Sequence, residues 1–128
     1  NVLTMVAMRT RRTLSNILIT LTAGTAFTAC AVAPGVPDTF SQVLSDGQLA
    51  KLRGCESGGN YNAVNPSGTY RGAYQFSRTT WNSIARMHYP FLAGVDPAQA
   101  WPWDQDRMAR ALWATSGRGQ WPHCGRNV

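Results

Sequence analysis

Glu56 is the only glutamate in this 128-residue chain, and it lies in the motif 55–60, Cys-Glu-Ser-Gly-Gly-Asn. A single carboxylic acid can act as a general acid and base when its pKa is raised toward neutrality. Leu49 and Leu52 precede Glu56 by seven and four residues, so all three share one face of a helix. Glycines at 58 and 59 favour the end of that helix, because glycine readily adopts the left-handed conformation of a C-cap. The sequence therefore predicts a partly buried Glu56 in the last turn of a helix.

That position predicts a raised pKa for Glu56. The negative end of the helix dipole disfavours the ionised carboxylate, and partial burial acts in the same direction. A second interpretation stays open from spacing alone. In it, Glu56 is a solvated residue at the end of a helix, or it pairs with Lys51 or Arg53.

The segments around Glu56 predict a short helix followed by a small hairpin. Ser45 is suited to cap a helix over residues 46–57. Two short runs rich in aromatic and β-branched residues, 60–64 and 69–76, flank the turn sequence Asn-Pro-Ser-Gly at 65–68. We expect an irregular hairpin, whose glycines let the backbone come close to a ligand.

Two further helices are expected after the hairpin. Ser77 is suited to cap a helix that runs to about Met87, and a short turn follows at 96–100. The last helix opens at 101–104, runs to about Ser116 and ends at the Gly-Arg-Gly of 117–119. The side chains expected to point inward are Trp81, Ile84, Ala85, Met108, Ala111 and Leu112. His88 extends the inner stripe of the first of these helices, and we expect it to be a packed or surface residue, not a base.

The three cysteines indicate one disulfide. Cys55 and Cys124 bracket the compact region, whereas Cys30 follows a segment that resembles an export signal. Two cysteines that close nearly a whole small exported domain are typical of a disulfide. With only His88 and His123 available and no paired ligand spacing, neither a zinc site nor another metal or cofactor is expected.

Residues 1–33 have the pattern of a signal peptide or lipoprotein signal. A basic stretch at 9–12 precedes an apolar stretch at 17–29 and then small residues. Cleavage near Cys30 would release the protein, lipidation of Cys30 at a lipobox-like sequence would anchor it, and an uncleaved anchor is a third route. Residues 34–45 are expected to be a short linker with an N-terminal turn, 46–125 the domain, and 126–128 a tail.

The charge gives no indication of nucleic-acid binding. Of the 12 Lys and Arg residues, Arg9, Arg11 and Arg12 lie in the leader, which leaves nine against six acidic residues, a net charge of +3. This excess is mild and forms no basic stripe along the chain. A polyanionic cell-envelope surface would be an equally good partner for such a charge.

Four stretches resemble the catalytic domain of the actinobacterial resuscitation-promoting factors. They are 55–60 (CESGGN), 72–76 (GAYQF), 80–81 (TW) and 117–124 (GRGQWPHC), and they extend over about residues 46–125. The wider kinship is with lysozyme-like lytic transglycosylases. The resemblance implies an α+β fold that is mainly helical, a small lysozyme-like domain with a short irregular β-hairpin and one disulfide, Cys55–Cys124.

The resemblance also implies site residues and a substrate. Glu56 would be the catalytic acid and base. Tyr70, Gln75 and Thr80 would line a glycan cleft, and Asn60 and Trp81 would shape and brace it. Arg71 stands where an aromatic residue is common in the family, and Ala73 replaces a usual glycine, which affects the expected substrate contacts. The substrate would be the bond between N-acetylmuramic acid and N-acetylglucosamine in peptidoglycan.

The distribution of carboxylates favours a mechanism with one acidic residue. Most glycosidases use two carboxylates, yet no second Asp or Glu lies between Glu56 and Val95. Asp96, Asp104 and Asp106 lie at expected helix starts, where capping would account for them. Together with the resemblance, this pattern leads us to expect a secreted, monomeric lytic transglycosylase or muramidase that acts on peptidoglycan glycan strands, with other cell-wall hydrolases as further partners. The alternatives are a wall-binding module without turnover and an envelope interaction protein.

Overall fold

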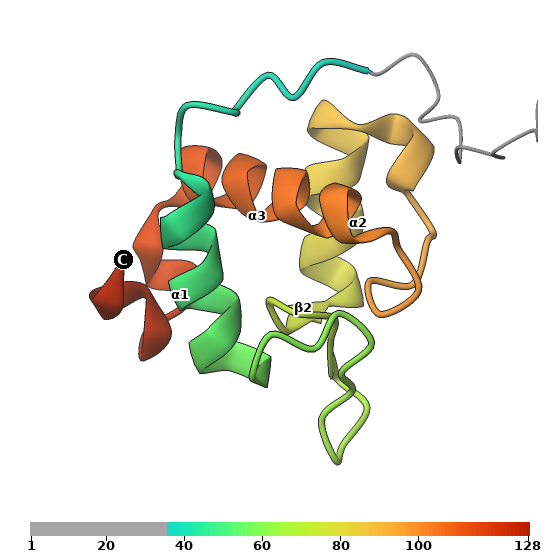
Figure 1. Ribbon diagram of the computed structural model, residues 1–128. Helices are drawn as coiled ribbons and strands as arrows, with labels where there is room; N and C mark the ends of the chain where they lie inside the picture. The colour runs from blue at the N-terminus through green and yellow to red at the C-terminus, as the bar shows by residue number, and fades with distance from the viewer. Residues whose placement is uncertain (1–35) are drawn as a thin grey trace, which may run out of the picture. The chain divides into compact units, whose positions relative to one another are not determined.

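The computed structural model describes residues 36–128 (Figure 1). The expected signal segment 1–33, including Cys30, lies outside the described residues. Within residues 36–128 the structure has three α-helices, three short 3-10 helices and one two-stranded sheet. This is the mainly helical architecture with a short hairpin that the sequence predicts.

The first helix, α1 (Asp46–Ser57), confirms the predicted position of Glu56. The Ser45 side chain accepts a hydrogen bond from the Gln48 amide, and the Gln48 side chain accepts one from the Ser45 amide, which completes a capping box. Gly58 ends the helix in the left-handed conformation, with φ of 67°. Leu49 and Leu52 are fully buried, so the face that leads to Glu56 packs on the core.

The predicted hairpin is present only in part: its two arms, on either side of the 65–68 turn, are joined by one bridge, and the two-stranded sheet forms around the next turn. Strands β1 (Tyr70–Arg71) and β2 (Phe76–Ser77) pair antiparallel, and a single bridge joins Val64 to Arg71. The Asn65–Gly68 turn closes with a hydrogen bond from the Gly68 amide to the Asn65 carbonyl. A second turn at 72–75 connects the two strands.

The remaining helices pack across the back of this hairpin. Ser77 caps α2 (Arg78–His88) as predicted, and α3 (Pro102–Ser116) runs between α1 and α2 in Figure 1. All six side chains predicted to point inward are buried. The short helices η1 (Pro90–Leu92), η2 (Arg118–Gln120) and η3 (Cys124–Asn127) complete the chain, and residues 96–100 form a single turn.

Two predictions for short segments are refined. Residues 39–43 form the predicted N-terminal turn, and Leu44 is buried in the core, so the packed region begins before α1. His88 packs edge-on against Phe40 and lies 3.0 Å from the Thr115 hydroxyl, in agreement with a packed role. None of the helices in residues 36–128 is both long and apolar enough to cross a membrane.

A buried amide, Gln105 on α3, joins three segments of the chain. Its Oε1 accepts a hydrogen bond from the Ala73 amide at 2.8 Å. Its Nε2 donates to the carbonyls of Tyr61 and Ala100, both at 2.9 Å. Gln105 is 0 % exposed, so these bonds satisfy an amide that would otherwise be costly to bury.

Gly72 allows the hairpin to approach Gln105. A Cβ at residue 72 would lie 2.5 Å from Gln105 Oε1, and φ is +81°. The sequence predicts that the hairpin glycines let the backbone come close to a ligand. For Gly72, the backbone instead approaches the protein's own buried amide.

The disulfide between Cys55 and Cys124 is formed, as predicted. It joins residues 69 positions apart, with a Cα–Cα distance of 5.7 Å. In Figure 1 the C-terminal segment lies beside α1, and η3 contacts that helix. The bond therefore closes almost the whole domain into one loop.

We expect Gln105→Leu to reduce the free energy of unfolding by about 3 kcal/mol or more. The substitution leaves the Ala73 amide and the carbonyls of Tyr61 and Ala100 buried without partners, at about 1–3 kcal/mol for each group. Urea unfolding measures the change. Gln99→Leu is the matched control, because Gln99 is exposed and should change stability by less than about 0.5 kcal/mol. Equal effects of the two variants would contradict the role assigned to Gln105.

We expect the double variant Cys55→Ser/Cys124→Ser to lose about 4 kcal/mol of stability. Closing a loop of this length removes that much chain entropy from the unfolded state. For a domain of this size the melting temperature should fall by more than about 15 °C. Calorimetry gives the value, with Cys30→Ser as the control that leaves the bond intact. An unchanged melting temperature in the double variant would show that the disulfide does not support the fold.

Candidate active site

The Glu56 carboxylate is partly buried and makes no hydrogen bond or ion pair with any of residues 36–128. Burial raises its pKa above the usual value for glutamate, while the charge of His123 partly opposes that change. A pKa of Glu56 above the usual value agrees with the prediction made from its position. Pairing of Glu56 with Arg53 is not observed, because Arg53 instead contacts the Tyr74 hydroxyl and lies 3.9 Å from Asp106.

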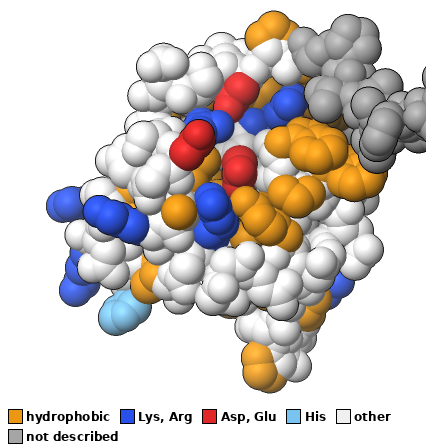
Figure 2. Space-filling view, viewed as in Figure 1, with side chains coloured by type: hydrophobic (Ala, Val, Ile, Leu, Met, Phe, Trp, Pro, Cys, Tyr) orange, Lys and Arg blue, Asp and Glu red, His pale blue; other side chains and the backbone are white. Residues whose placement is uncertain are grey.

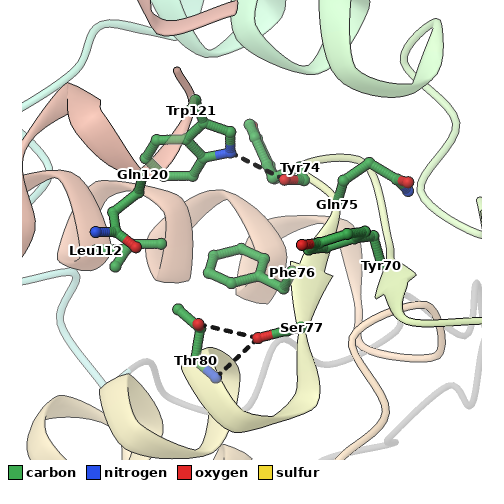
Figure 3. Close-up of a pocket in the computed structure, with 9 residues that line it drawn as sticks. All are labelled: Tyr70, Tyr74, Gln75, Phe76, Ser77, Thr80, Leu112, Gln120 and Trp121. Carbon is green, nitrogen blue, oxygen red and sulfur yellow. Dashed lines mark hydrogen bonds between the residues drawn. The ribbon is translucent and has the colours of Figure 1, made fainter. Parts of the chain in front are cut away.

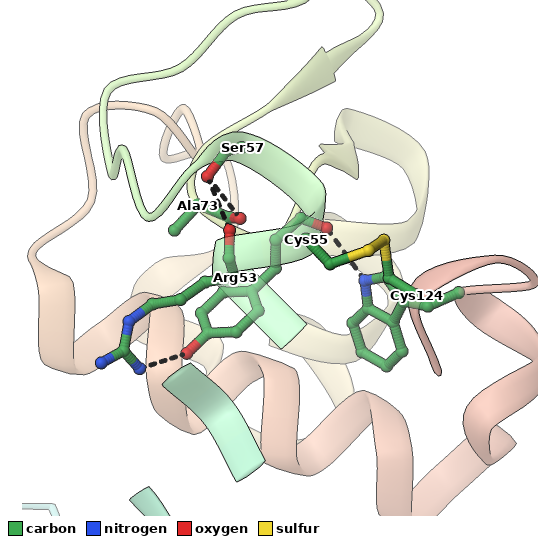
Figure 4. The surroundings of a disulfide bond; sticks show 7 residues. Arg53, Cys55, Ser57, Ala73 and Cys124 are labelled. Carbon is green, nitrogen blue, oxygen red and sulfur yellow. Dashed lines mark hydrogen bonds between the residues drawn. A yellow bond between two sulfur atoms is a disulfide. The ribbon is translucent and has the colours of Figure 1, made fainter. Parts of the chain in front are cut away.

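Both chain neighbours of Glu56 are attached to other segments (Figure 4). On one side, Cys55 is bonded to Cys124. On the other, the Ser57 hydroxyl contacts the Ala73 carbonyl at 2.8 Å and the Arg53 carbonyl at 3.2 Å. These two attachments fix the last turn of α1 against the hairpin and the C-terminal segment, so the backbone that carries Glu56 is held from both sides.

Residues close in the chain to these attachments line a pocket of about 190 Å³ (Figure 3). It is formed by the hairpin, the start of α2, one residue of α3 and the C-terminal segment. Its lining residues are Tyr70, Tyr74, Gln75, Phe76, Ser77, Thr80, Leu112, Gln120 and Trp121. Three of the predicted cleft residues, Tyr70, Gln75 and Thr80, therefore come together in one pocket.

Gln75 has an unusual backbone conformation for a residue in this pocket. It is the only non-glycine residue with positive φ among residues 36–128, at 54°. Such a conformation costs about 1–3 kcal/mol and is often found at functional sites. The Gln75 side chain donates to the Gly72 carbonyl at 2.9 Å, which holds the 72–75 turn in place and sets the direction of the amide.

Two predicted substrate-binding residues do not line the pocket. Trp81 is 0 % exposed, and its indole N–H donates to the Leu92 carbonyl at 2.9 Å, so Trp81 is a core residue. It packs edge-on against Phe76, a pocket residue, at 5.2 Å between ring centroids; its contribution to the pocket is therefore support. Asn60 is exposed, and its side chain accepts a hydrogen bond from the Asn62 amide within the loop after α1.

Sequence reasoning did not identify the contribution of the C-terminal segment to the pocket. Gln120 and Trp121 form part of the wall, and the Trp121 indole N–H donates to the Tyr74 carbonyl at 2.9 Å. His123, which acts on the pKa of Glu56, also belongs to this segment. The signals in the sequence are the resemblance of 117–124 to the known family and the nearness of these residues to Cys124, the partner of Cys55.

Glu56 itself is not among the lining residues of the pocket. Its position follows from its neighbours, because Ser57 is bonded to Ala73, next to the lining residue Tyr74, and Cys55 is bonded to Cys124, three residues after Trp121. The site therefore consists of one acid with a raised pKa at a helix end, beside a mostly polar pocket with aromatic walls.

The carboxylate of Asp106 is engaged elsewhere, and the prediction of a capping role for it is wrong. Asp106 Oδ1 accepts hydrogen bonds from the hydroxyls of Tyr61 and Tyr74, at 2.8 and 2.5 Å. Burial and these bonds raise the pKa of Tyr74, so its phenol stays protonated. Because Tyr74 also contacts Arg53, the cluster joins α3, the hairpin and α1 behind the pocket.

Comparison with known proteins agrees with this site. Residues 45–124 match the family model described as a transglycosylase-like domain. The "Probable transglycosylase SceD" of Staphylococcus epidermidis is 44% identical over 73 residues, which cover 57% of this chain and 32% of that protein. The protein of the same name from Staphylococcus aureus strain Newman is 42% identical over 81 residues, covering 63% and 34% respectively.

The match thus spans about a third of the length of these curated relatives. The family-model match over residues 45–124 includes α1 with Glu56, the hairpin, the pocket residues and both cysteines of the disulfide. On the basis of this match over residues 45–124, the chain belongs to the transglycosylase-like domain family.

Proposed function

We propose that this protein cleaves peptidoglycan between N-acetylmuramic acid and N-acetylglucosamine, with Glu56 as the sole acid and base. The observation that carries the proposal is an unpaired, partly buried glutamate whose two chain neighbours are bonded to the segments that line the pocket. Burial also raises its pKa. A general acid is effective when its pKa lies close to the working pH, and burial moves Glu56 in that direction.

The engagement of every aspartate supports a mechanism with one carboxylate. The chain has five aspartates besides Glu56, and each is held by a cation or by phenols. The pairs are Asp38 with Arg110, Asp46 with Arg110, Asp96 with Arg71, Asp104 with Arg107, and Asp106 with Tyr61 and Tyr74. Asp46 is exposed and has only a surface ion pair, but it lies at the opposite end of α1 from Glu56. The other four are engaged, so no second carboxylate is placed as the nucleophile or base of a two-carboxylate glycosidase.

In the proposed reaction, Glu56 donates its proton to the glycosidic oxygen as the bond to C1 of N-acetylmuramic acid breaks. The N-acetyl group of the substrate supplies the oxygen that stabilises C1 during this step. The ionised Glu56 then takes the proton of the C6 hydroxyl as O6 attacks C1. The product is a 1,6-anhydro end, and Glu56 regains its proton. If water replaces O6 in the second step, the product is a reducing end.

The pocket residues would bind the glycan. Tyr70 is half-exposed at the rim and offers a flat ring, and Gln75 and Thr80 offer an amide and a hydroxyl. Polar groups of this kind, fixed on an aromatic wall, suit a sugar with several hydroxyls and amides. A location in the cell envelope and a role in wall remodelling or resuscitation are part of this proposal.

We expect Glu56→Gln to reduce turnover of purified peptidoglycan sacculi by about 10²- to 10⁴-fold, because glutamine cannot transfer the proton. The melting temperature at neutral pH should not fall, since the amide removes an unpaired, partly buried charge. Mass spectrometry of the soluble products measures turnover, and thermal unfolding measures stability.

The products distinguish the possible outcomes. Fragments one water lighter than reducing-end muropeptides, formed only by the unsubstituted protein, would establish a transglycosylase. Reducing ends would establish a muramidase. Full activity in Glu56→Gln would contradict the assignment of Glu56. Binding to sacculi without any soluble product would favour a wall-binding module.

We expect His123→Gln to move the alkaline limb of the pH–activity profile to higher pH. Cleavage needs protonated Glu56, so activity falls as pH rises through the pKa of Glu56. The charge of His123 lowers that pKa, and its removal raises it. His88→Gln is the matched control, because His88 contacts Phe40 and Thr115 instead. Identical profiles for the two variants would show that His123 does not act on the catalytic acid.

A further inference from the structure

Two exposed tryptophans stack on each other at the start of α3. Trp101 is 61% exposed and Trp103 is 43% exposed. Their ring centroids are 5.0 Å apart and their planes differ by 6°. Figure 2 shows hydrophobic side chains gathered on the surface beside this end of α3. Neither tryptophan lines the pocket, so the function proposed above gives them no role.

The core does not account for this pair. Trp81 and Trp121 are buried, and their indole N–H groups donate to backbone carbonyls. In contrast, neither the Trp101 nor the Trp103 indole N–H has an acceptor among residues 36–128. The pair therefore presents an aromatic face and two free hydrogen-bond donors to solvent.

The backbone under the pair is well fixed. Pro102, between the two tryptophans, occupies the first position of α3, where its ring suits the helix. The Trp101 carbonyl accepts from the amides of Asp104 and Gln105, both at 3.0 Å. Gln105 is in turn held by its three buried hydrogen bonds. A surface that is already ordered loses little entropy when it binds a ligand.

The charges in the segment that carries the pair do not favour a polyanion as its ligand. Residues 97–106 contain two aspartates and no Lys or Arg. Asp104 lies 3.4 Å from Arg107, and the two side chains are 10% and 14% exposed, so they form a shielded pair. The segment 97–106 itself therefore supplies no cationic side chain to contact nucleic acid phosphates or anionic lipids, and Arg107, the next residue, is paired with Asp104.

An uncharged sugar ring fits the chemistry that remains. A hexopyranose has an apolar C–H face that can stack on an indole. The hydroxyl or acetamido oxygens at its edge can accept hydrogen bonds from the free indole N–H groups. The exposed amide of Gln99, two residues before Trp101, provides a further polar partner. A flat, rigid and nearly uncharged surface is suited to one stretch of a polysaccharide.

We propose that Trp101 and Trp103 form a saccharide-stacking platform, separate from the pocket, that binds N-acetylhexosamine units of a glycan strand. The choice of glycan rests on the proposed function. The platform holds the insoluble polymer close to the enzyme, either on the strand being cut or on a neighbouring one. Its contribution is greater retention on the wall.

The first test measures binding of the full Glu56→Gln chain to purified sacculi by cosedimentation. We expect adding Trp101→Ala to weaken binding about tenfold, equivalent to about 1.4 kcal/mol. Met87→Ala is the matched control, since Met87 is an apolar side chain on α2 that is 58% exposed; it should leave binding unchanged. Equal binding of both variants and the parent would overturn the proposal.

The second test does not depend on the folding of a variant. In a ¹⁵N spectrum of the Glu56→Gln chain, each of the five tryptophans gives one indole N–H signal. A soluble N-acetylglucosamine oligomer should shift the signals of Trp101 and Trp103. Shifts confined to Trp121, or none at millimolar oligomer, would overturn the platform.

Two outcomes separate this inference from the proposed function. If the unsubstituted protein does not cut sacculi but the Trp101 and Trp103 signals shift with the oligomer, the platform stands and the catalytic proposal fails. If the protein cuts sacculi and the Trp101 and Trp103 signals do not move, the catalytic proposal stands and the platform fails. A concentration-dependent dimer that is lost in Trp101→Ala would assign the surface to self-association and overturn the platform.

Discussion

The buried side chain of Gln105 is the constraint on which the arrangement of the domain depends. Its three hydrogen bonds connect α3 to the hairpin at Ala73, to the loop at Tyr61 and to the turn at Ala100. A two-stranded sheet with two residues in each strand has little stability of its own. The hairpin is therefore held in place by the helix behind it, and the absence of a side chain at Gly72 makes that contact sterically possible.

This constraint matters for the site because the hairpin supplies much of the pocket wall. Ala73, which donates its amide to Gln105, also accepts the Ser57 hydroxyl at its carbonyl. A single residue thus connects α3 to the last turn of α1. Together with the disulfide on the other side of Glu56, it fixes the acid relative to the pocket without any contact to the carboxylate itself.

The Glu56 carboxylate has no partner, whereas the aspartates are paired with arginines or tyrosine hydroxyls. An unpaired acid with a raised pKa suits acid catalysis. An arginine next to Glu56 would stabilise the ionised form and lower its pKa. The structure instead directs Arg53 to Tyr74 and Asp106, and Arg71 to Asp96 through two hydrogen bonds of 2.6 Å. The ion pairs therefore strengthen the scaffold while the partly buried acid retains its raised pKa.

The local sequence predicted the helices and the disulfide well. Helix signals lie within a few residues of the helix, and only two cysteines lie in the compact region. The Ser45 and Ser77 caps and the apolar spacing specify α1 and α2, and Gly58 and Gly117 specify the ends of α1 and α3. Two cysteines in the compact region allow one pairing. The turn at 65–68 and the partly buried position of Glu56 follow from the same kind of pattern. The gathering of Tyr70, Gln75 and Thr80 was expected from the resemblance of their motifs to a known family.

Other features depended on contacts between distant residues. Nothing in the local pattern distinguishes the buried Gln105 from the exposed Gln99, or shows that Asp106 meets two tyrosines 45 and 32 positions away. Trp81 and Trp101 are the same residue type, yet one is enclosed in the core and the other faces solvent. The sequence by itself determined the helices, the turn and the acid at the end of α1. The tertiary structure decided which polar groups are buried together and which aromatic rings stay exposed, because burial and pairing depend on the packing of segments far apart in the chain.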